Sequence, residues 1–237
     1  MVGSCRKVSM TACLAGALLL LCYPLLVFAE SSDRAVNDGI RARVETLQSG
    51  SDLVIQGATV ASTTVLPALY QRRDFAPVWT NPSAIKQLFD AVRNIDEDGL
   101  DPEDYHLATL EKLQTEVGSE ASVNPARTAD LDVLLTDSLV RLGYHLLIGK
   151  VDPVELDGNW NVNRTINGRD AVLALSSAIA EGSVDNLLAA VRPQHMYYRH
   201  LQNALAHYRA IAAAGGWPGV PPGPTIGRSS ASSAHAT

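Results

Sequence analysis

Ser83 and Lys86 are the two residues whose types and spacing point most directly to covalent chemistry. On a helix, a lysine three residues after a serine lies one turn away and can activate the hydroxyl, as in penicillin-recognising acyl enzymes. Such enzymes also need a Ser-Asp-Asn-type element and a Lys-Thr-Gly strand, and the sequence contains neither. Ser83 also begins a predicted helix, where serine is common because its hydroxyl can bond to nearby backbone groups. The pair therefore supports only an alternative hypothesis, that of a small acyl enzyme.

Trp79 and Trp160 are the candidate binding residues. Both are predicted to lie in or beside loops, where an exposed indole ring could stack on a sugar ring. Indoles in such places more often seal the end of a helical core, and both interpretations stay open for the two residues. A glycoside hydrolase built on an unidentified pair of carboxylates belongs to the alternative hypothesis as well, although nothing marks out two of the 25 acidic residues.

The segment 94–99 resembles the opening of a calcium-binding loop, with oxygen-bearing side chains at its first, third and fifth positions and glycine at its sixth. The twelfth position, which needs a bidentate carboxylate, is Tyr105, and Pro102 occupies the ninth. His200 and His207 share one side of a predicted helix but lie about 10 Å apart along its axis. We therefore expect no metal site, no cofactor and no catalytic residue.

The segments that must position these side chains are predicted to be mostly helical. Three predicted helices begin with a capping side chain followed by proline, a combination that satisfies free N–H groups and presets the backbone. These starts are Asn81-Pro82, Asp101-Pro102 and Asn124-Pro125. The longest apolar stripe, Leu131 to Leu146, predicts a central helix that ends at Gly149 and holds His145 as a hydrogen-bonded core residue.

Further helices are predicted over 170–181, 184–191 and 193–214, with a loop over 150–169. No segment shows the sustained alternation of a strand, so the predicted fold class is all-α. The expected organisation is a flexible lead-in over 30–38, one compact multi-helix domain over 39–214, and a disordered Gly/Pro/Ser/Ala linker and tail over 215–237.

The first 29 residues are typical of a secretory signal peptide. Arg6 and Lys7 precede an uncharged stretch that ends in the small residue Ala29, after which cleavage is expected. An uncleaved membrane anchor is the other interpretation, and either one exports residues 30 onward to the periplasm. If this segment is not cleaved, residues 1–29 would be the only contact with the membrane.

Composition excludes some functions of the exported part. Removing residues 1–29 takes away two of 19 basic residues and no acidic one, so the formal charge changes from -6 to -8. This acidic balance argues against a nucleic-acid binder. All three cysteines, at positions 5, 13 and 22, lie in the removed segment, which leaves no disulfide, thiolate ligand or cysteine nucleophile.

Four blocks in the order 66–79, 98–106, 149–160 and 208–218 resemble the N-terminal scaffold domain of large YcbB-type L,D-transpeptidases. They read Leu66-Pro67-Ala68-Leu69-Tyr70 with Arg73-Asp74-Phe75-Ala76-Pro77-Val78-Trp79; Asp98-Gly99-Leu100-Asp101-Pro102-Glu103-Asp104-Tyr105-His106; Gly149-Lys150-Val151-Asp152-Pro153 with Asn159-Trp160; and Tyr208-Arg209 with Gly215-Gly216-Trp217-Pro218. The similarity covers about residues 60–225. It implies a mostly helical scaffold domain.

In that family a peptidoglycan-binding-like domain and a catalytic domain follow, and the catalytic domain uses a cysteine in a Ser-His-Gly-Cys-type motif to build 3→3 crosslinks in peptidoglycan. Neither later domain is recognisable in this sequence, and no catalytic residue can be carried over. The resemblance therefore implies a non-catalytic scaffold or interaction domain, truncated or stand-alone. Its expected partner is peptidoglycan or a periplasmic cell-wall synthesis protein.

Overall fold

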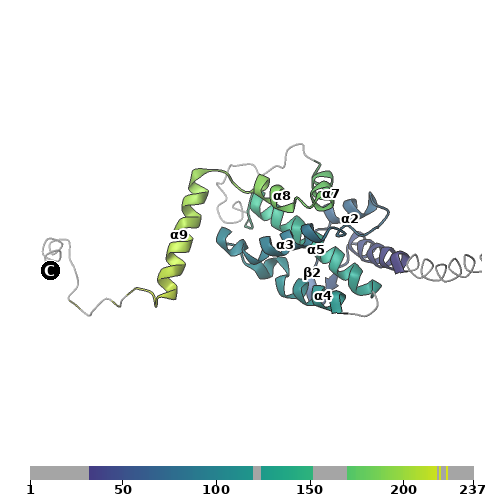
Figure 1. Cartoon of the computed structure of the whole chain (residues 1–237), viewed down its shortest axis with the longest axis horizontal. Helices are drawn as coiled ribbons and strands as arrows, with labels where there is room; N and C mark the ends of the chain where they lie inside the picture. The colour runs from purple at the N-terminus through teal and green to yellow at the C-terminus, as the bar shows by residue number, and fades with distance from the viewer. Residues whose placement is uncertain (1–31, 120–123, 152–169, 218, 220–222, 224–237) are drawn as a thin grey trace, which may run out of the picture. The chain divides into compact units, whose positions relative to one another are not determined.

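The structure is a computed structural model that describes residues 32–119, 124–151, 170–217, 219 and 223 (Figure 1). The chain divides into two compact units, Met1–Gln194 and His195–Thr237. The predicted signal segment, the candidate Trp160 and most of the predicted tail lie outside the described residues. No helix in the described part is long and apolar enough to cross a membrane.

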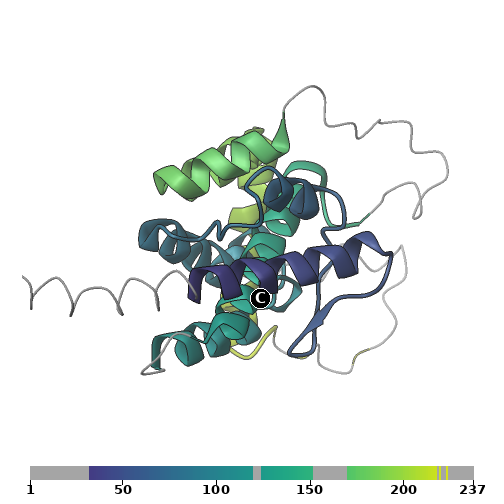
Figure 2. The same cartoon turned by 90° about the vertical axis from the view of Figure 1, so that its right-hand side faces the viewer.

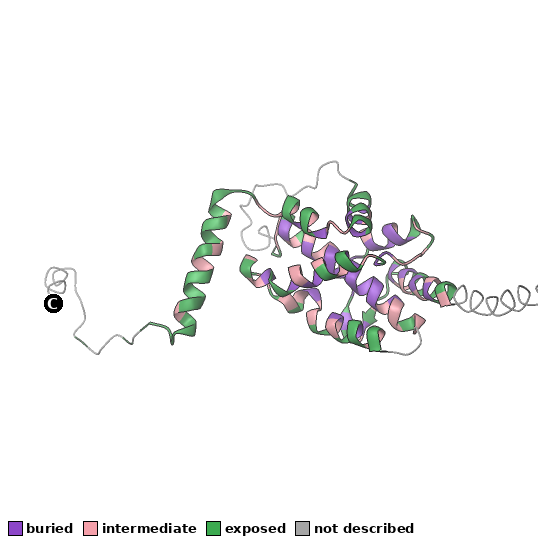
Figure 3. Ribbon diagram, viewed as in Figure 1, coloured by how far each residue is buried: buried purple, intermediate pink, exposed green. Residues whose placement is uncertain are grey.

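The central element of the first unit is α5 (Pro125–Ile148). It begins as predicted, because the Asn124 side chain accepts a hydrogen bond from the Arg127 N–H at 3.3 Å and Pro125 occupies the first helical position. It ends at Gly149, whose φ of 101° few other residues adopt. Buried residues occur along most of its length (Figure 3), so several helices must cover it.

Besides α5 and a helix over residues 32–48, the described part of this unit contains five helices and two 3-10 turns. They are α2 (Val65–Gln71), α3 (Pro82–Arg93), η1 (Ile95–Asp98), η2 (Pro102–Tyr105), α4 (Leu107–Ser119), α7 (Ala171–Glu181) and α8 (Val184–Val191). α2, α3, α4 and α8 pack directly on α5, and α7 packs on α2, α3 and α8. This arrangement confirms the all-α fold and the helices predicted after Asn81, Asn124 and Asp170.

A helix over 32–48 corrects the predicted flexible lead-in, of which residues 32–38 are helical (Figure 2). Val36, Ile40, Val44 and Leu47 are all buried. Their spacing of three or four residues places them on one helical face. The prediction of a flexible lead-in was wrong because it relied on the polar residues 30–34, whereas the apolar stripe of this helix begins only at Val36. The helical domain therefore starts before residue 39.

A two-stranded hairpin is the only sheet in the described residues. β1 (Val54–Ile55) pairs antiparallel with β2 (Ala58–Thr59), and Val54 lies opposite Thr59. Gln56 and Gly57 turn the chain with φ values of 48° and 90°, the positive pair that a tight hairpin requires. Two residues per strand are too few to show the alternation from which a sheet is predicted.

The second unit contains α9 (Met196–Ala213), which confirms the helix predicted over 193–214. His195 caps the N-terminus of α9, where its side chain accepts a hydrogen bond from the Tyr197 N–H at 3.2 Å. α9 has no buried residue (Figure 3). The buried apolar cluster in the described residues lies between residues 36 and 188.

Candidate functional site

The structure places Ser83 and Lys86 on α3 without the contact that an acyl enzyme needs. The Lys86 amine forms an ion pair with Asp90, one turn further along the helix. The Ser83 hydroxyl accepts a hydrogen bond from the Gln87 side chain at 3.3 Å. Each group is therefore held by another neighbour, and Lys86 is not positioned as the base for Ser83. This geometry gives no support to the acyl-enzyme hypothesis.

Trp79 lies in the core with 7% of its surface exposed. Its indole N–H donates to the Thr136 hydroxyl at 2.9 Å, and its backbone N–H donates to the Asp132 carboxylate at 3.0 Å. A ring enclosed in this way presents no face to a sugar. The structure therefore favours the packing interpretation of Trp79 over the stacking one.

Asp132 is the centre of this buried polar cluster. Its carboxylate accepts hydrogen bonds from the Val78 and Trp79 N–H groups and from the Tyr70 hydroxyl, the last at 2.7 Å. Burial raises the pKa of Asp132, because desolvation outweighs the stabilising hydrogen bonds. Burial and the nearby Asp132 also raise the pKa of Tyr70 well above its ordinary value. The cluster fastens the 78–79 segment to the side of α5.

Asp137, one turn further along α5, anchors a second segment. It accepts the backbone N–H groups of Ala61 and Ser62 at 3.0 and 2.8 Å, and the His106 ring nitrogen lies 3.1 Å from its other oxygen. Desolvation acts to raise the pKa of Asp137, but the hydrogen bonds from His106 and Ser62 and the charge of Arg141 lower it overall. The Asp137 side chain is 0% exposed, and its carboxylate holds the 61–62 segment against α5.

His145 behaves as predicted, as a histidine hydrogen-bonded within the domain. Its Nδ1 lies 2.9 Å from the Tyr105 hydroxyl, and Tyr105 is fully buried. Burial, and then the charge of Arg141, lower the pKa of His145. The neutral ring is therefore the favoured form at this position.

The predicted fragment of a calcium loop forms the turn between α3 and η2. Asp98, its fifth residue, accepts hydrogen bonds from Arg192 at both carboxylate oxygens, from Nε to Oδ1 at 3.2 Å and from Nη2 to Oδ2 at 2.8 Å. An arginine therefore uses the carboxylate oxygens that a cation would require. Across the described residues, no group of three or more histidines, cysteines or acids is arranged to hold a metal ion.

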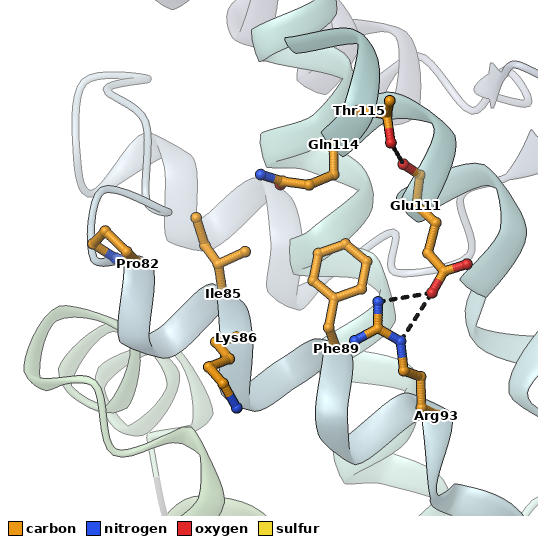
Figure 4. Close-up of a pocket in the computed structure, with 8 residues that line it drawn as sticks. All are labelled: Pro82, Ile85, Lys86, Phe89, Arg93, Glu111, Gln114 and Thr115. Carbon is orange, nitrogen blue, oxygen red and sulfur yellow. Dashed lines mark hydrogen bonds and ion pairs between the residues drawn. The ribbon is translucent and has the colours of Figure 1, made fainter. Parts of the chain in front are cut away.

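An open groove lies between α3 and α4 on the first unit (Figure 4). It has a volume of about 530 Å³. Ile85 and Phe89 supply its apolar floor, and the polar side chains of Glu111 and Gln114 lie across from them on α4 (Figure 4). The lining residues are Pro82, Ile85, Lys86, Phe89, Arg93, Glu111, Gln114 and Thr115.

Charged side chains also line the groove. The Arg93 guanidinium lies 5.2 Å from the centre of the Phe89 ring and forms an ion pair with Glu111 at 2.8 Å, while Lys86 is exposed. An apolar floor beside polar and charged side chains suits the binding of a partner that is partly polar and partly apolar.

The sequence predicted only one wall of this groove. Ile85 and Phe89 lie four residues apart in the sequence, a spacing that predicts one helical face, but this spacing does not show that their edges remain accessible. Glu111 and Gln114 carried no signal, because Arg93 and Glu111 meet only when α3 packs beside α4. Trp160, the second predicted binding residue, lies outside the described residues.

Together these features define a helical support domain whose buried acids fix its own segments in place. The family model for the Scaffold domain matches residues 64–205, more than half of the chain, and the chain belongs to this non-catalytic domain family. The match confirms the resemblance to the scaffold domain of L,D-transpeptidases. No curated protein and no solved structure matches the chain.

Proposed function

We propose that this protein is an exported scaffold domain of the peptidoglycan 3→3 crosslinking system, and that it binds peptidoglycan or a periplasmic cell-wall synthesis protein without catalysing the crosslink itself. The observation that carries the proposal is the match of residues 64–205 to the Scaffold domain. The absence of any cysteine after position 22 supports the non-catalytic part, because the crosslinking chemistry of the related enzymes uses a cysteine nucleophile.

The α3–α4 groove is the proposed contact site for the partner. Its apolar and charged lining residues lie on two helices that pack on the central α5, so the site is preformed on a rigid support. Lys86 is 77% exposed at the groove edge, and its ion pair with Asp90 is a surface pair. Such a pair contributes about 0 to 1 kcal/mol and is therefore easily exchanged for a contact with a partner.

The first experiment incubates the chain from residue 30 with muropeptides that carry tetrapeptide stems. We expect no 3→3 crosslinked product by mass spectrometry, and cosedimentation of the protein with purified peptidoglycan sacculi. Formation of crosslinks would overturn the non-catalytic assignment. Absence of sacculus binding would overturn peptidoglycan as the partner and leave a cell-wall protein, to be sought by crosslinking in the periplasm.

Two lysine variants test the groove itself. Lys86 lines the groove and Lys112 does not, yet both are exposed and each pairs with a carboxylate four residues later. We expect Lys86→Glu to weaken binding to sacculi about fivefold or more and Lys112→Glu to leave it unchanged. Equal effects of the two substitutions would show that net charge, and not the groove, governs binding.

A further inference from the structure

The ring of His106 lies where a buried carboxylate and a partly exposed guanidinium of α5 meet. Its Nε2 lies 3.1 Å from Oδ2 of Asp137 and 2.9 Å from Nη1 of Arg141. These two partner atoms are 3.7 Å from each other, so both approach Nε2 from the same side. The side chains of His106 and Asp137 are 10% and 0% exposed, so little water reaches their contact.

One ring nitrogen cannot bond to both of these partners at the same time. A guanidinium can only donate hydrogen bonds, and an ionised carboxylate can only accept them. Nε2 can therefore bond to Asp137 only while it carries a proton, and to Arg141 only while it does not. Two partners with opposite requirements compete for one position on the ring.

The other ionisable groups around η2 have partners of their own or face solvent. The 61–62 segment that packs on Asp137 contains no ionisable side chain, and Asp101 and Glu103 are exposed. The paired groups of η2, α3, α4 and α5 are Tyr105 with His145, Asp104 with Lys150, Lys86 with Asp90, Arg93 with Glu111, and Lys112 with Glu116. Asp137 and Arg141 are therefore the charged groups that contact the His106 ring.

The backbone of His106 needs a firm anchor in either protonation state. His106 ends η2 with a φ of 63°, in the left-handed region that residues other than glycine seldom adopt. Such a conformation persists only where the surrounding contacts hold it in place. Asp137 and Arg141 lie one turn apart on α5, so the ring stays tied to this helix whichever of them it contacts.

We propose that His106 is a proton-operated switch that exchanges its partner on α5. The neutral ring carries its proton on Nδ1 and accepts a hydrogen bond at Nε2 from Arg141. A proton taken up from solvent at lower pH turns Nε2 into a donor to Asp137. The positive charge of the ring then repels the Arg141 guanidinium toward solvent, so the acid form presents a cation on α5 that the neutral form holds against His106.

The test is nuclear magnetic resonance of the nitrogen-labelled chain from residue 30, which contains every residue of the buried cluster. Spectra are recorded between about pH 8 and pH 5, the range in which histidine ordinarily changes its charge. The two ring nitrogens report the tautomer and the charge of each histidine, and His106→Gln identifies the His106 signals by their loss. We expect the neutral ring to be the Nδ1–H tautomer and the Arg141 guanidinium signals to change with the same midpoint as the ring.

Two arginine variants test which group selects the tautomer. Arg141→Met removes the donor to Nε2, so the ratio of tautomers should move at least about tenfold toward Nε2–H, with Asp137 as the remaining partner. Arg127→Met is the matched control, because Arg127 also lies on α5 but pairs with Glu116, and it should leave the ratio unchanged. Circular dichroism establishes that both variants keep their helix content.

Three results would overturn the proposal. The first is a neutral His106 that carries its proton on Nε2 in the unchanged chain. The second is an Arg141 guanidinium whose signals do not follow the titration of the ring. The third is an Arg141→Met variant that folds and keeps the Nδ1–H tautomer, because the guanidinium would then not be the group that selects it.

Discussion

At the scale of single residues, the buried acids of α5 explain why the segments around it hold their shape. Asp132 and Asp137 lie five residues apart on α5, and each accepts two backbone N–H groups from a different non-helical segment. A buried carboxylate with several donors is stabilising only while all of them stay in place. These two residues therefore tie residues 61–62 and 78–79 to the centre of the fold.

The lowered pKa of Asp137 makes its contribution to stability dependent on pH. Its folded-state pKa lies below its unfolded value, so the stabilisation is present above pH about 4 and is lost as the pH falls through the folded pKa. We expect Asp137→Asn to reduce the free energy of unfolding at pH 7 by about 1–3 kcal/mol and to make the protein less sensitive to acid between pH 7 and pH 3.

Urea unfolding at the two pH values measures this effect, with the exposed Asp52→Asn as a control for loss of a carboxylate. Asp132 has a raised pKa, so its contribution runs the other way and weakens as the pH rises through that value. An acid sensitivity of Asp137→Asn equal to that of the unchanged protein would show that another group governs acid unfolding.

At the scale of elements, the turn between α7 and α8 is fixed to the start of α3. Gly182 ends α7 with a φ of 67°, and its carbonyl accepts a hydrogen bond from the Gln87 side chain at 2.7 Å. The Asn81 side chain, which caps α3, also donates to the Ala180 carbonyl at 3.0 Å. One capping residue therefore begins α3 and holds α7 against it.

Gly182→Ala should disrupt this junction. A Cβ at position 182 would lie 2.9 Å from the Asn81 amide nitrogen and 3.3 Å from the Ser83 Cβ, and alanine is strained at a positive φ. We expect a loss of about 1–3 kcal/mol in the free energy of unfolding. Gly143→Ala, inside α5 with open space around the added carbon, should be neutral or gain up to about 1 kcal/mol. Thermal unfolding that ranks the two variants in the reverse order would contradict this account.

At the scale of the whole molecule, the core lies within the first unit. Its buried apolar residues fall between Val36 and Leu188, and α9 has none. We therefore expect a chain of residues 30–194 to unfold with a free energy within about 0.5 kcal/mol of that of residues 30–237, as measured by chemical denaturation. A loss of more than about 2 kcal/mol would show that residues after 194 support the core.

The sequence by itself determined the helices, because the signals that define them are local. Asn81-Pro82 and Asn124-Pro125 cap the two helices that follow them within three residues, and the apolar stripe of α5 repeats within each turn. The same local order of motifs carried the resemblance to the scaffold domain. The helix over residues 32–38 was not predicted, because the first apolar residue of its buried stripe is Val36 and the residues before it show no helical repeat.

Only the tertiary structure decided what the side chains do. Trp79 looked like a loop indole that could bind sugar, but packing against α5 encloses it beside Thr136. The α3–α4 groove forms where α3 packs beside α4, and the same packing brings together Arg93 and Glu111, which are 18 residues apart. Burial and contact between distant residues depend on which helical faces pack together. The spacing of apolar residues along one helix does not show which other helix packs against it.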